Sequence, residues 1–259
     1  MGIINVTPDS FYDGGRSIVL RDIVAQAEKM VDQGATFLDI GGYSSRPGAK
    51  DISETEELER VVPVLEALSK EFPKMHLSID TFRSTVAKQA VEAGAALVND
   101  ISGGMLDDEM LSTVAELKVP YVLMHMKGTP ETMSSLANYT NVTKELVHYF
   151  SERIAAARKA GIHDIIADPG FGFAKTRAHN FEILKNFELL KALEVPLLAG
   201  LSRKSLIYKT LGTTPEEALN GTTVLNSLAL EKGANILRVH DVKEAKECVT
   251  LLQSVYNTD

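Results

Sequence analysis

Three polar residues, Asp80, Asn99 and Asp168, each lie at the end of an apolar stretch of strand length. Carboxylate and amide groups can match the ring N–H, amino and carbonyl groups of a flat heterocycle. A buried polar site of this kind rejects analogues that lack the matching group by ~10⁴- to 10⁵-fold. The types and positions of these residues therefore predict a pocket that recognises a polar ring.

Four further residues form a second set that suits an anion: Arg46, Lys204, Arg238 and His240. Three of them follow the last two apolar runs of the chain, where barrels often hold a phosphate. A guanidinium fork matches pairs of phosphate oxygens, and the turn at 202–205 can add helix N-terminal amides. Together the two sets predict a heterocycle joined to a phosphate or a pyrophosphate.

The first apolar run, residues 2–6, ends in a polar loop. Pro8 has no amide N–H for a strand ladder and favours an extended residue before it, so the strand ends here. Asn5, Asp9 and Phe11 place an amide, a carboxylate and an aromatic ring at this end. A loop at the carboxyl end of a strand suits a site, but an ordinary solvated turn fits this stretch equally well.

Short apolar runs alternate with amphipathic stretches along the whole chain. The runs are 2–6, 36–40, 76–80, 96–99, 120–124, 164–168, 196–200 and 235–239. This alternation predicts parallel strands joined by helical crossovers. Eight such units in a chain of 259 residues favour a closed (β/α)₈ TIM barrel over an open doubly wound sheet. We therefore predict an α/β fold with one domain over residues 1–259 and an active site at the C-terminal ends of the strands.

Local signals set the expected ends of several helices. Ser53 and Glu56 form a capping box, and Pro63 is expected to kink or split the helix that follows. Thr214 and Pro215 predict a helix start that runs to residue 232. Other helices are expected over 18–33, 82–93, 107–117, 141–160, 180–193 and from 241 to 255.

Composition limits the classes of function. The net charge is −8, and no cluster of basic residues suggests a nucleic-acid surface. No apolar run is long enough to cross a membrane, and no basic segment precedes an apolar one at the N-terminus. The single cysteine, Cys248, cannot form an intramolecular disulfide, so a cytoplasmic location is the default. An anionic small-molecule substrate remains compatible with this charge.

Seven segments, in order and across nearly the whole chain, resemble the motifs of the dihydropteroate synthase family: 2–11, 39–48, 78–81, 99–104, 168–175, 200–205 and 238–240. The resemblance implies a (β/α)₈ transferase of folate biosynthesis, a sulfonamide target that is usually a homodimer and uses Mg²⁺. It would condense 6-hydroxymethyl-7,8-dihydropterin diphosphate with 4-aminobenzoate and release diphosphate. The chain departs at Ser45, where threonine is usual, and at Tyr43, where an amide or carboxylate is common.

The resemblance also implies roles by motif. The residues implied in catalysis are Asn5, Asp9, Arg46, Asp80, Asp168 and Lys204. Those implied for the pterin are Asp80, Asn99, Ile101, Met124, Asp168 and Lys204. Those implied for the diphosphate are Asn5, Ser45, Arg46, Arg238 and His240, with Asn5 also holding Mg²⁺. Those implied for 4-aminobenzoate are Phe11, Pro47, Phe173, Lys204 and Ser205.

The residue types agree with this chemistry. Loss of diphosphate leaves a cation spread over the pterin, so a carboxylate such as Asp80 or Asp168 is needed near it. No protein nucleophile is required, and no Gly-x-Ser-x-Gly signature is evident. Two alternatives stay open: a pterin-binding barrel that passes a folate methyl group to a corrinoid protein, and a catalytically silent binding relative. The first would not need the cationic set, and the second would be expected to lose its loop residues.

Five other polar residues have structural interpretations. Asp39 is interpreted first as a buried structural acid inside a strand, and Asp100 as the cap of a loop. His125 fits a satisfied hydrogen bond at least as well as a ligand role. Arg83 and Arg203 fit either surface charges or supports of the site, and the sequence does not separate these two readings.

Overall fold

The structure is a computed structural model of the chain, and it describes residues 1–6, 16–44 and 51–256. Every predicted apolar run coincides with a strand, although the last two strands are short. The strands are β1 (Gly2–Asn5), β2 (Phe37–Gly41), β3 (His76–Asp80), β4 (Leu97–Asp100), β5 (Tyr121–Met124), β6 (Ile165–Asp168), β7 (Leu198–Ala199) and β8 (Ile236–Leu237). Strands β1 to β6 form a parallel sheet in sequence order, and β7 pairs with β8.

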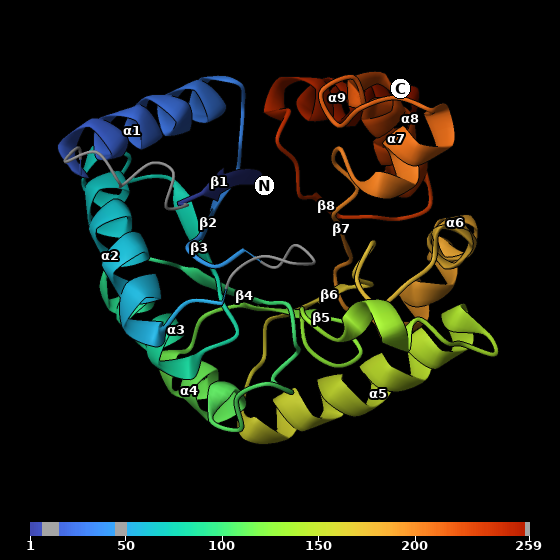
Figure 1. Ribbon diagram of the computed structural model, residues 1–259, viewed down its shortest axis with the longest axis horizontal. Coiled ribbons are helices and arrows are strands. Elements are labelled where there is room, and N and C mark those ends of the chain that lie inside the picture. Colours follow the sequence, from blue (N-terminus) through green and yellow to red (C-terminus); the bar gives the residue numbers. More distant parts are fainter. Residues whose placement is uncertain (7–15, 45–50, 257–259) are drawn as a thin grey trace.

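Hydrogen bonds at two junctions, β6 with β7 and β8 with β1, close these strands into a ring. Between β6 and β7, the amide of Ala167 donates to the carbonyl of Pro196 at 2.9 Å. Between β8 and β1, the amide of Ile3 donates to the carbonyl of Val239 at 2.9 Å. Figure 1 shows the helices arranged around the outside of this ring. The predicted (β/α)₈ barrel is therefore confirmed, and the carboxyl ends of its parallel strands face one mouth.

The helices follow the predicted alternation with the strands. They are α1 (Arg16–Asp32), α2 (Glu54–Glu71), α3 (Ser84–Glu92), α4 (Met110–Leu117), α5 (Val142–Ala160), α6 (Arg177–Lys185), α7 (Ser205–Leu211), α8 (Leu219–Glu231) and α9 (Val242–Tyr256). Two 3₁₀ turns span Met133–Leu136 and Phe187–Leu193. The predicted helix 180–193 is thus divided between α6 and the second of these turns. In the described part of the chain, no helix is long and apolar enough to cross a membrane.

The sequence predicted a kink or a split at Pro63, and helix α2 runs through Pro63 without a split. Pro63 lies on the exposed face of the helix. Water can therefore hydrate the carbonyl that loses its helical partner there. The opposite face buries Val61, Val64 and Leu65 against the barrel, and this packing outweighs the missing hydrogen bond.

The predicted helix start at Thr214 is wrong, because α8 begins at Leu219. The carbonyls of Pro215 and Glu216 accept hydrogen bonds from the Arg203 guanidinium, at 2.9 and 2.6 Å, and so are drawn away from a helical ladder. Arg203 also forms a two-pronged ion pair with Asp241, with both N–O distances at 2.8 Å. Arg203 is therefore a support between loops rather than a free surface charge.

The barrel interior is apolar at the amino-terminal ends of the strands. Leu97, Val122, Ile166 and Leu198 are buried there in one cluster, and Phe37 packs against it. Each of them is the first or second residue of its strand, as expected for the stacked layers that fill such a barrel. The interior is therefore a packed core at this end, and the predicted polar residues at the strand ends lie at the opposite mouth.

Helix α5 offers a test of how far packing against the barrel stabilises the fold. Phe150 of α5 is fully buried, so Phe150→Ala should lower the free energy of unfolding by about 3–5 kcal/mol. The exposed Leu189→Ala, our control, should change it by less than about 0.5 kcal/mol. Urea denaturation followed by circular dichroism would measure both, and equal effects would contradict this account of the core.

Candidate active site

Polar side chains from neighbouring strands form one row at the mouth. In the parallel register, Asn5 of β1 lies beside Gly41 of β2. Gly41 in turn lies beside Asp80 of β3, and Asp80 beside Asn99 of β4. Residues paired in this way point to the same face of a sheet. Two of the three residues predicted to recognise a ring, Asp80 and Asn99, are therefore direct neighbours.

One layer below this row, the carboxylate of Asp39 in β2 is completely buried. It accepts hydrogen bonds from Ser78 Oγ at 2.6 Å and from Asn99 Nδ2 at 3.0 Å. A third donor is Arg238 Nε, also at 2.6 Å. A buried carboxylate requires such donors, because an unpaired charge inside a barrel is very costly. Asp39 is therefore a buried acid, as predicted, but it also holds two predicted binding residues.

Arg238 connects Asp39 to the row above it. While its Nε donates to Asp39, its Nη2 donates to Asp80 Oδ2 at 2.6 Å. Burial raises the pKa of Asp80, and the Arg238 guanidinium opposes that rise. From the sequence, Arg238 was predicted to bind an anion and Asp80 to bind a ring. The structure pairs these two residues directly, so the two predicted sets of residues meet at Arg238.

Across the mouth, Asp168 and Lys204 form the other side of the site. Asp168 ends β6, is buried, and accepts a hydrogen bond from the amide of Gly170 at 2.8 Å. Burial raises the pKa of Asp168, and the nearby Lys204 ammonium opposes this. Lys204 Nζ donates to the carbonyl of Phe171 and lies 4.9 Å from the ring centroid of Phe173. Burial lowers the pKa of Lys204 to about 8, although Asp168 opposes the shift.

An apolar wall lies between these polar groups. Ile101 after β4 and Met124 at the end of β5 are buried in one cluster with Ala174. Phe173 is half-buried and packs against the same cluster. A flat ring held by the polar groups would therefore meet apolar side chains on its faces. The structure brings Ile101, Met124 and Phe173 together, although they lie far apart in the sequence.

The end of β8 and the start of α7 supply the remaining described groups. His240 is exposed, its Nδ1 lies 3.0 Å from Ser202 Oγ, and its backbone amide donates to the same oxygen at 3.1 Å. Ser205 is the first residue of α7 and is exposed beside Lys204. These residues border the mouth, as the sequence predicted.

Some predicted site residues cannot be placed. Those that lie outside the described residues are Asp9, Phe11, Ser45, Arg46 and Pro47. Their assignments stay predictions. All of them belong to the two segments, 7–15 and 45–50, that follow β1 and β2.

Asn5 is the predicted metal ligand, and its side chain is exposed at the end of β1. Over residues 1–6, 16–44 and 51–256, no group of three or more His, Cys, Asp or Glu side chains could hold a metal ion. Mg²⁺ commonly binds through one or two protein oxygens, with substrate phosphates and water completing its shell. The amide oxygen of Asn5 fits that kind of site, and a complete protein cage is not needed.

Two of the structural interpretations are confirmed by contacts. The buried carboxylate of Asp100 accepts hydrogen bonds from the amides of Ser102 and Gly104, both at 2.7 Å, so it caps its loop. The ring Nδ1 of His125 lies 2.9 Å from Lys175 Nζ, so this histidine has a satisfied hydrogen bond. These contacts give both residues a structural role.

Arg83 is a support of the mouth. It donates to the carbonyl of Ile52 at 2.7 Å and forms an ion pair with the buried Glu57 at 2.7 Å. Its guanidinium carbon also lies 5.4 Å from the ring centroid of Tyr43. Tyr43 and Ile52 lie on either side of the segment 45–50. Arg83 therefore holds both ends of the chain segment in which Ser45, Arg46 and Pro47 were predicted to act.

The pairing of Asp39 with Arg238 was not predicted from the sequence. A signal was present, because Asp39 is a charged residue inside an otherwise apolar strand and lies two residues before Gly41. The alternation of side chains in a strand places both residues on one face. No local signal, however, identifies a partner 199 residues away in the sequence.

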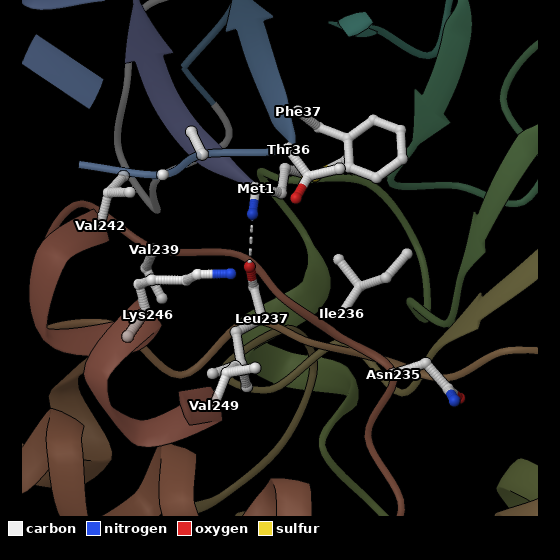
Figure 2. Close-up of a pocket in the computed structure, with 13 residues that line it drawn as sticks. Met1, Thr36, Phe37, Asn235, Ile236, Leu237, Val239, Val242, Lys246 and Val249 are labelled. Carbon is white, nitrogen blue, oxygen red and sulfur yellow. Dashed lines mark hydrogen bonds between the residues drawn. The ribbon is translucent and has the colours of Figure 1, made fainter. Parts of the chain in front are cut away.

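A cavity of about 230 Å³ lies at the other end of the barrel (Figure 2). Phe37 and Ile236, the first residues of β2 and β8, help to line it. The amino group of Met1 donates to the carbonyl of Leu237 there at 2.9 Å. No predicted site residue lines this cavity, so it is separate from the mouth described above.

The arrangement at the mouth combines three chemical properties. Carboxylates and an amide can read a polar ring, apolar side chains can cover its faces, and cationic groups stand beside it. A guanidinium and an ammonium near buried carboxyl groups suit a substrate that carries negative charge and develops positive charge on a ring.

Comparisons with known proteins agree with this chemistry. A family profile described as "Pterin binding enzyme" matches residues 1–240. A dihydropteroate synthase of Synechocystis sp. is 47% identical over 246 residues, which cover 94% of this chain and 85% of that protein. The crystal structure of Yersinia pestis dihydropteroate synthase in a sulfonamide drug complex has a TM-score of 0.93 and 41% identity, over 100% of this chain and 94% of that one. The structure of Xanthomonas albilineans dihydropteroate synthase in complex with 7,8-dihydropteroate has a TM-score of 0.89 and 40% identity, over 100% of this chain and 94% of that one. The chain therefore belongs to the dihydropteroate synthase family of pterin binding enzymes.

Proposed function

We propose that the mouth of this barrel joins 6-hydroxymethyl-7,8-dihydropterin diphosphate to 4-aminobenzoate and releases diphosphate. The observation that carries the proposal is the shared network in which Arg238 contacts both Asp39 and Asp80 beside Asn99. In this network Asp80, which could bind a ring, is in direct contact with Arg238, which could bind an anion. The substrate combines such a ring and such an anion through one methylene.

The ring would be recognised by Asp80, Asn99 and Asp168, with Lys204 beside them. An ionised Asp39 can only accept hydrogen bonds, so the Nδ2 group of Asn99 must be the atom that faces it. The other amide atom, Oδ1, is then directed away from Asp39 and toward the mouth. Asn99 would then offer an acceptor to a ring N–H or amino group. This orientation gives the site a preference between a donor and an acceptor edge of the ring.

The diphosphate would be bound by Asn5, Arg238 and His240, with Ser45 and Arg46 predicted to join them. Two of the five N–H groups of the Arg238 guanidinium engage Asp39 and Asp80. The same side chain can thus contact the leaving group while it remains fixed to the acids that bind the ring. We infer that Arg238 aligns the two parts of the substrate.

The 4-aminobenzoate would lie against the ring of Phe173 and the stem of Lys204, with Ser205 near its carboxylate. The contact of Lys204 Nζ over Phe173, at 4.9 Å, supports this placement because it builds a flat wall at the mouth. Phe11 and Pro47 are predicted to complete this part of the site.

The reaction breaks the bond between the methylene carbon and the diphosphate oxygen, and the oxygen leaves with the electron pair. Positive charge then spreads over the pterin, where the buried carboxylates of Asp168 and Asp80 would stabilise it. The amine of 4-aminobenzoate attacks the methylene carbon and afterwards loses a proton. No covalent link to the protein is formed at any point.

Asn5 would hold Mg²⁺. When bound, the ion neutralises charge on the diphosphate and so improves it as a leaving group. Arg238 and His240, with the predicted Arg46, would be the protein's own contacts to that charge. The presence of the metal remains a proposal.

We also propose that the chain forms a homodimer through α7 and α8. Leu211, Val224 and Leu228 are exposed, and the side chain of Leu211 lies close to Gly221 of α8. Positions 221, 224 and 228 have helical spacing, so the side chains of Val224 and Leu228 lie on the same face as Gly221.

A cytoplasmic location stays a prediction from the single cysteine.

The activity is tested directly with purified protein, the dihydropterin diphosphate, 4-aminobenzoate and Mg²⁺. We expect diphosphate release that requires the amine and that falls when the metal is chelated. A protein without amine-dependent condensation would contradict the proposal. That result would favour a silent binding protein or a barrel that transfers a methyl group, neither of which releases diphosphate.

The role of Asp39 is tested with Asp39→Asn, which keeps the shape of the side chain but removes its charge. We expect kcat/KM to fall at least about tenfold, because hydrogen bonds to charged groups contribute ~1.5–3 kcal/mol. Asp164→Asn makes the same chemical change at an exposed site before β6 and should have little effect. Steady-state kinetics with both substrates would measure this, and similar values for the two variants would rule out the network as the centre of the site.

The dimer is tested with Leu228→Arg, which places a charge in the centre of the proposed interface. We expect the sedimentation coefficient to change from that of a dimer to that of a monomer, because a buried unpaired charge is costly. Leu251→Arg makes the same change at an exposed position of α9 and should leave the dimer intact. A wild-type chain that sediments as a monomer would refute this interface.

A further inference from the structure

Lys175 is a buried lysine whose partners are unusual. Its side chain is only 8% exposed, although it follows a loop at the mouth of the barrel. Its Nζ lies 2.9 Å from His125 Nδ1, and it donates to the carbonyls of Gly170 at 3.0 Å and of Phe173 at 2.9 Å. The carbonyl of His125 is a further acceptor at 3.2 Å. The ammonium is thus surrounded by backbone carbonyls and one ring nitrogen.

The chemistry of this group determines the state of His125. The Lys175 ammonium has three N–H donors and no acceptor, so an N–H directed at His125 Nδ1 requires that nitrogen to accept and the imidazole to be neutral. Burial lowers the pKa of His125 to about 2, and the positive charge of Lys175 lowers it further. Burial also lowers the pKa of Lys175, while Asp168 opposes this shift. His125 therefore acts as a fixed acceptor for the lysine.

The loop that Lys175 holds has a backbone that needs outside support. Gly170 and Gly172 have φ values of 68° and 87°, in the left-handed region. Ala174 has a φ of 47°, which an alanine rarely adopts without tertiary contacts. The carbonyls on both sides of Gly172 turn toward Lys175 Nζ. The ammonium thus closes the loop around itself, much as a bound cation would.

This loop connects the two halves of the candidate site. It begins at Asp168, which is proposed to bind the pterin, and it carries Phe173, which is proposed to contact 4-aminobenzoate. Lys204 donates to the carbonyl of Phe171 in the same loop. Through His125, Lys175 also fixes the chain directly after Met124. One buried charge therefore sets the distance between the end of β5 and the wall at Phe173.

We propose that Lys175 is a positioning residue for 4-aminobenzoate, because its ammonium holds the carbonyls of residues 170 and 173 and thereby places the ring of Phe173. The inference rests on the proposed function, since it assumes that Phe173 contacts this substrate. Lys175 itself does not touch the substrates. Its effect should therefore appear in the KM for 4-aminobenzoate and not in the binding of the pterin alone.

The test is Lys175→Met, which keeps the unbranched stem and removes the donors. We expect the KM for 4-aminobenzoate to rise about tenfold or more, as for loss of a hydrogen bond from a charged group. The Kd for a pterin measured by calorimetry should change less than about threefold, within the effect of a weak contact. Lys127→Met removes a lysine of the same region that pairs with Glu145 at the surface, and it should change neither value.

A double-mutant cycle separates positioning from general destabilisation. If Lys175 acts through Phe173, the variant that combines Lys175→Met with Phe173→Ala should have a KM no higher than Phe173→Ala alone. The inference would be overturned if the two substitutions raised the KM for 4-aminobenzoate independently, so that their factors multiply in the double variant. An unchanged KM in a folded Lys175→Met protein would also overturn it. If Phe173→Ala itself leaves the KM unchanged, the proposed placement of 4-aminobenzoate is wrong and the inference falls with it.

A second variant covers the case in which Lys175→Met does not fold. His125→Phe keeps an aromatic ring and removes one of the four acceptors of the ammonium. We expect it to raise the KM for 4-aminobenzoate about two- to fivefold, as for one ordinary hydrogen bond, with the Kd for the pterin unchanged. An equal change in both constants would overturn the inference.

Discussion

The buried negative charge of Asp39 is the interaction on which the mouth of the barrel depends. A carboxylate inside a barrel must be paired, and its donors come from three other strands or their ends: Ser78 in β3, Asn99 in β4 and Arg238 after β8. The cost of leaving this charge unpaired fixes the positions of all three partners. Asp39 thus links the first half of the chain to its last strand.

In the proposed function, the same constraint would couple ring recognition to anion binding. Arg238 would contact a leaving group through its remaining N–H groups, because its Nε and Nη2 engage Asp39 and Asp80. An ion pair that is partly shielded from water is stronger than one at the surface, so the coupling is substantial. The opposite side of the mouth has the same design, since Lys204 lies near Asp168 and also packs over Phe173. Each side therefore combines an acid with a cation.

Basic side chains also hold the loops around this site. The contacts are those of Arg60 with the carbonyl of residue 42, Arg153 with that of residue 103, Lys175 with that of residue 170, and Arg203 with that of residue 215. A loop cannot satisfy its own carbonyls by a regular ladder, so long donors from neighbouring elements do so. The loops thereby gain fixed positions while their other side chains stay available for substrates.

Local patterns in the sequence predicted the barrel and the strand-end residues that the structure places at its mouth, because apolar runs and capping signals are local and eight parallel strands direct their ends to one side. The sequence could not decide that α2 continues through Pro63 or that α8 begins at Leu219, since packing and the contacts of Arg203 override local preference there. The sequence alone also did not predict the pairing of Asp39 with Arg238. Charges 199 residues apart meet only when the barrel closes, and only tertiary structure brings them within 2.6 Å.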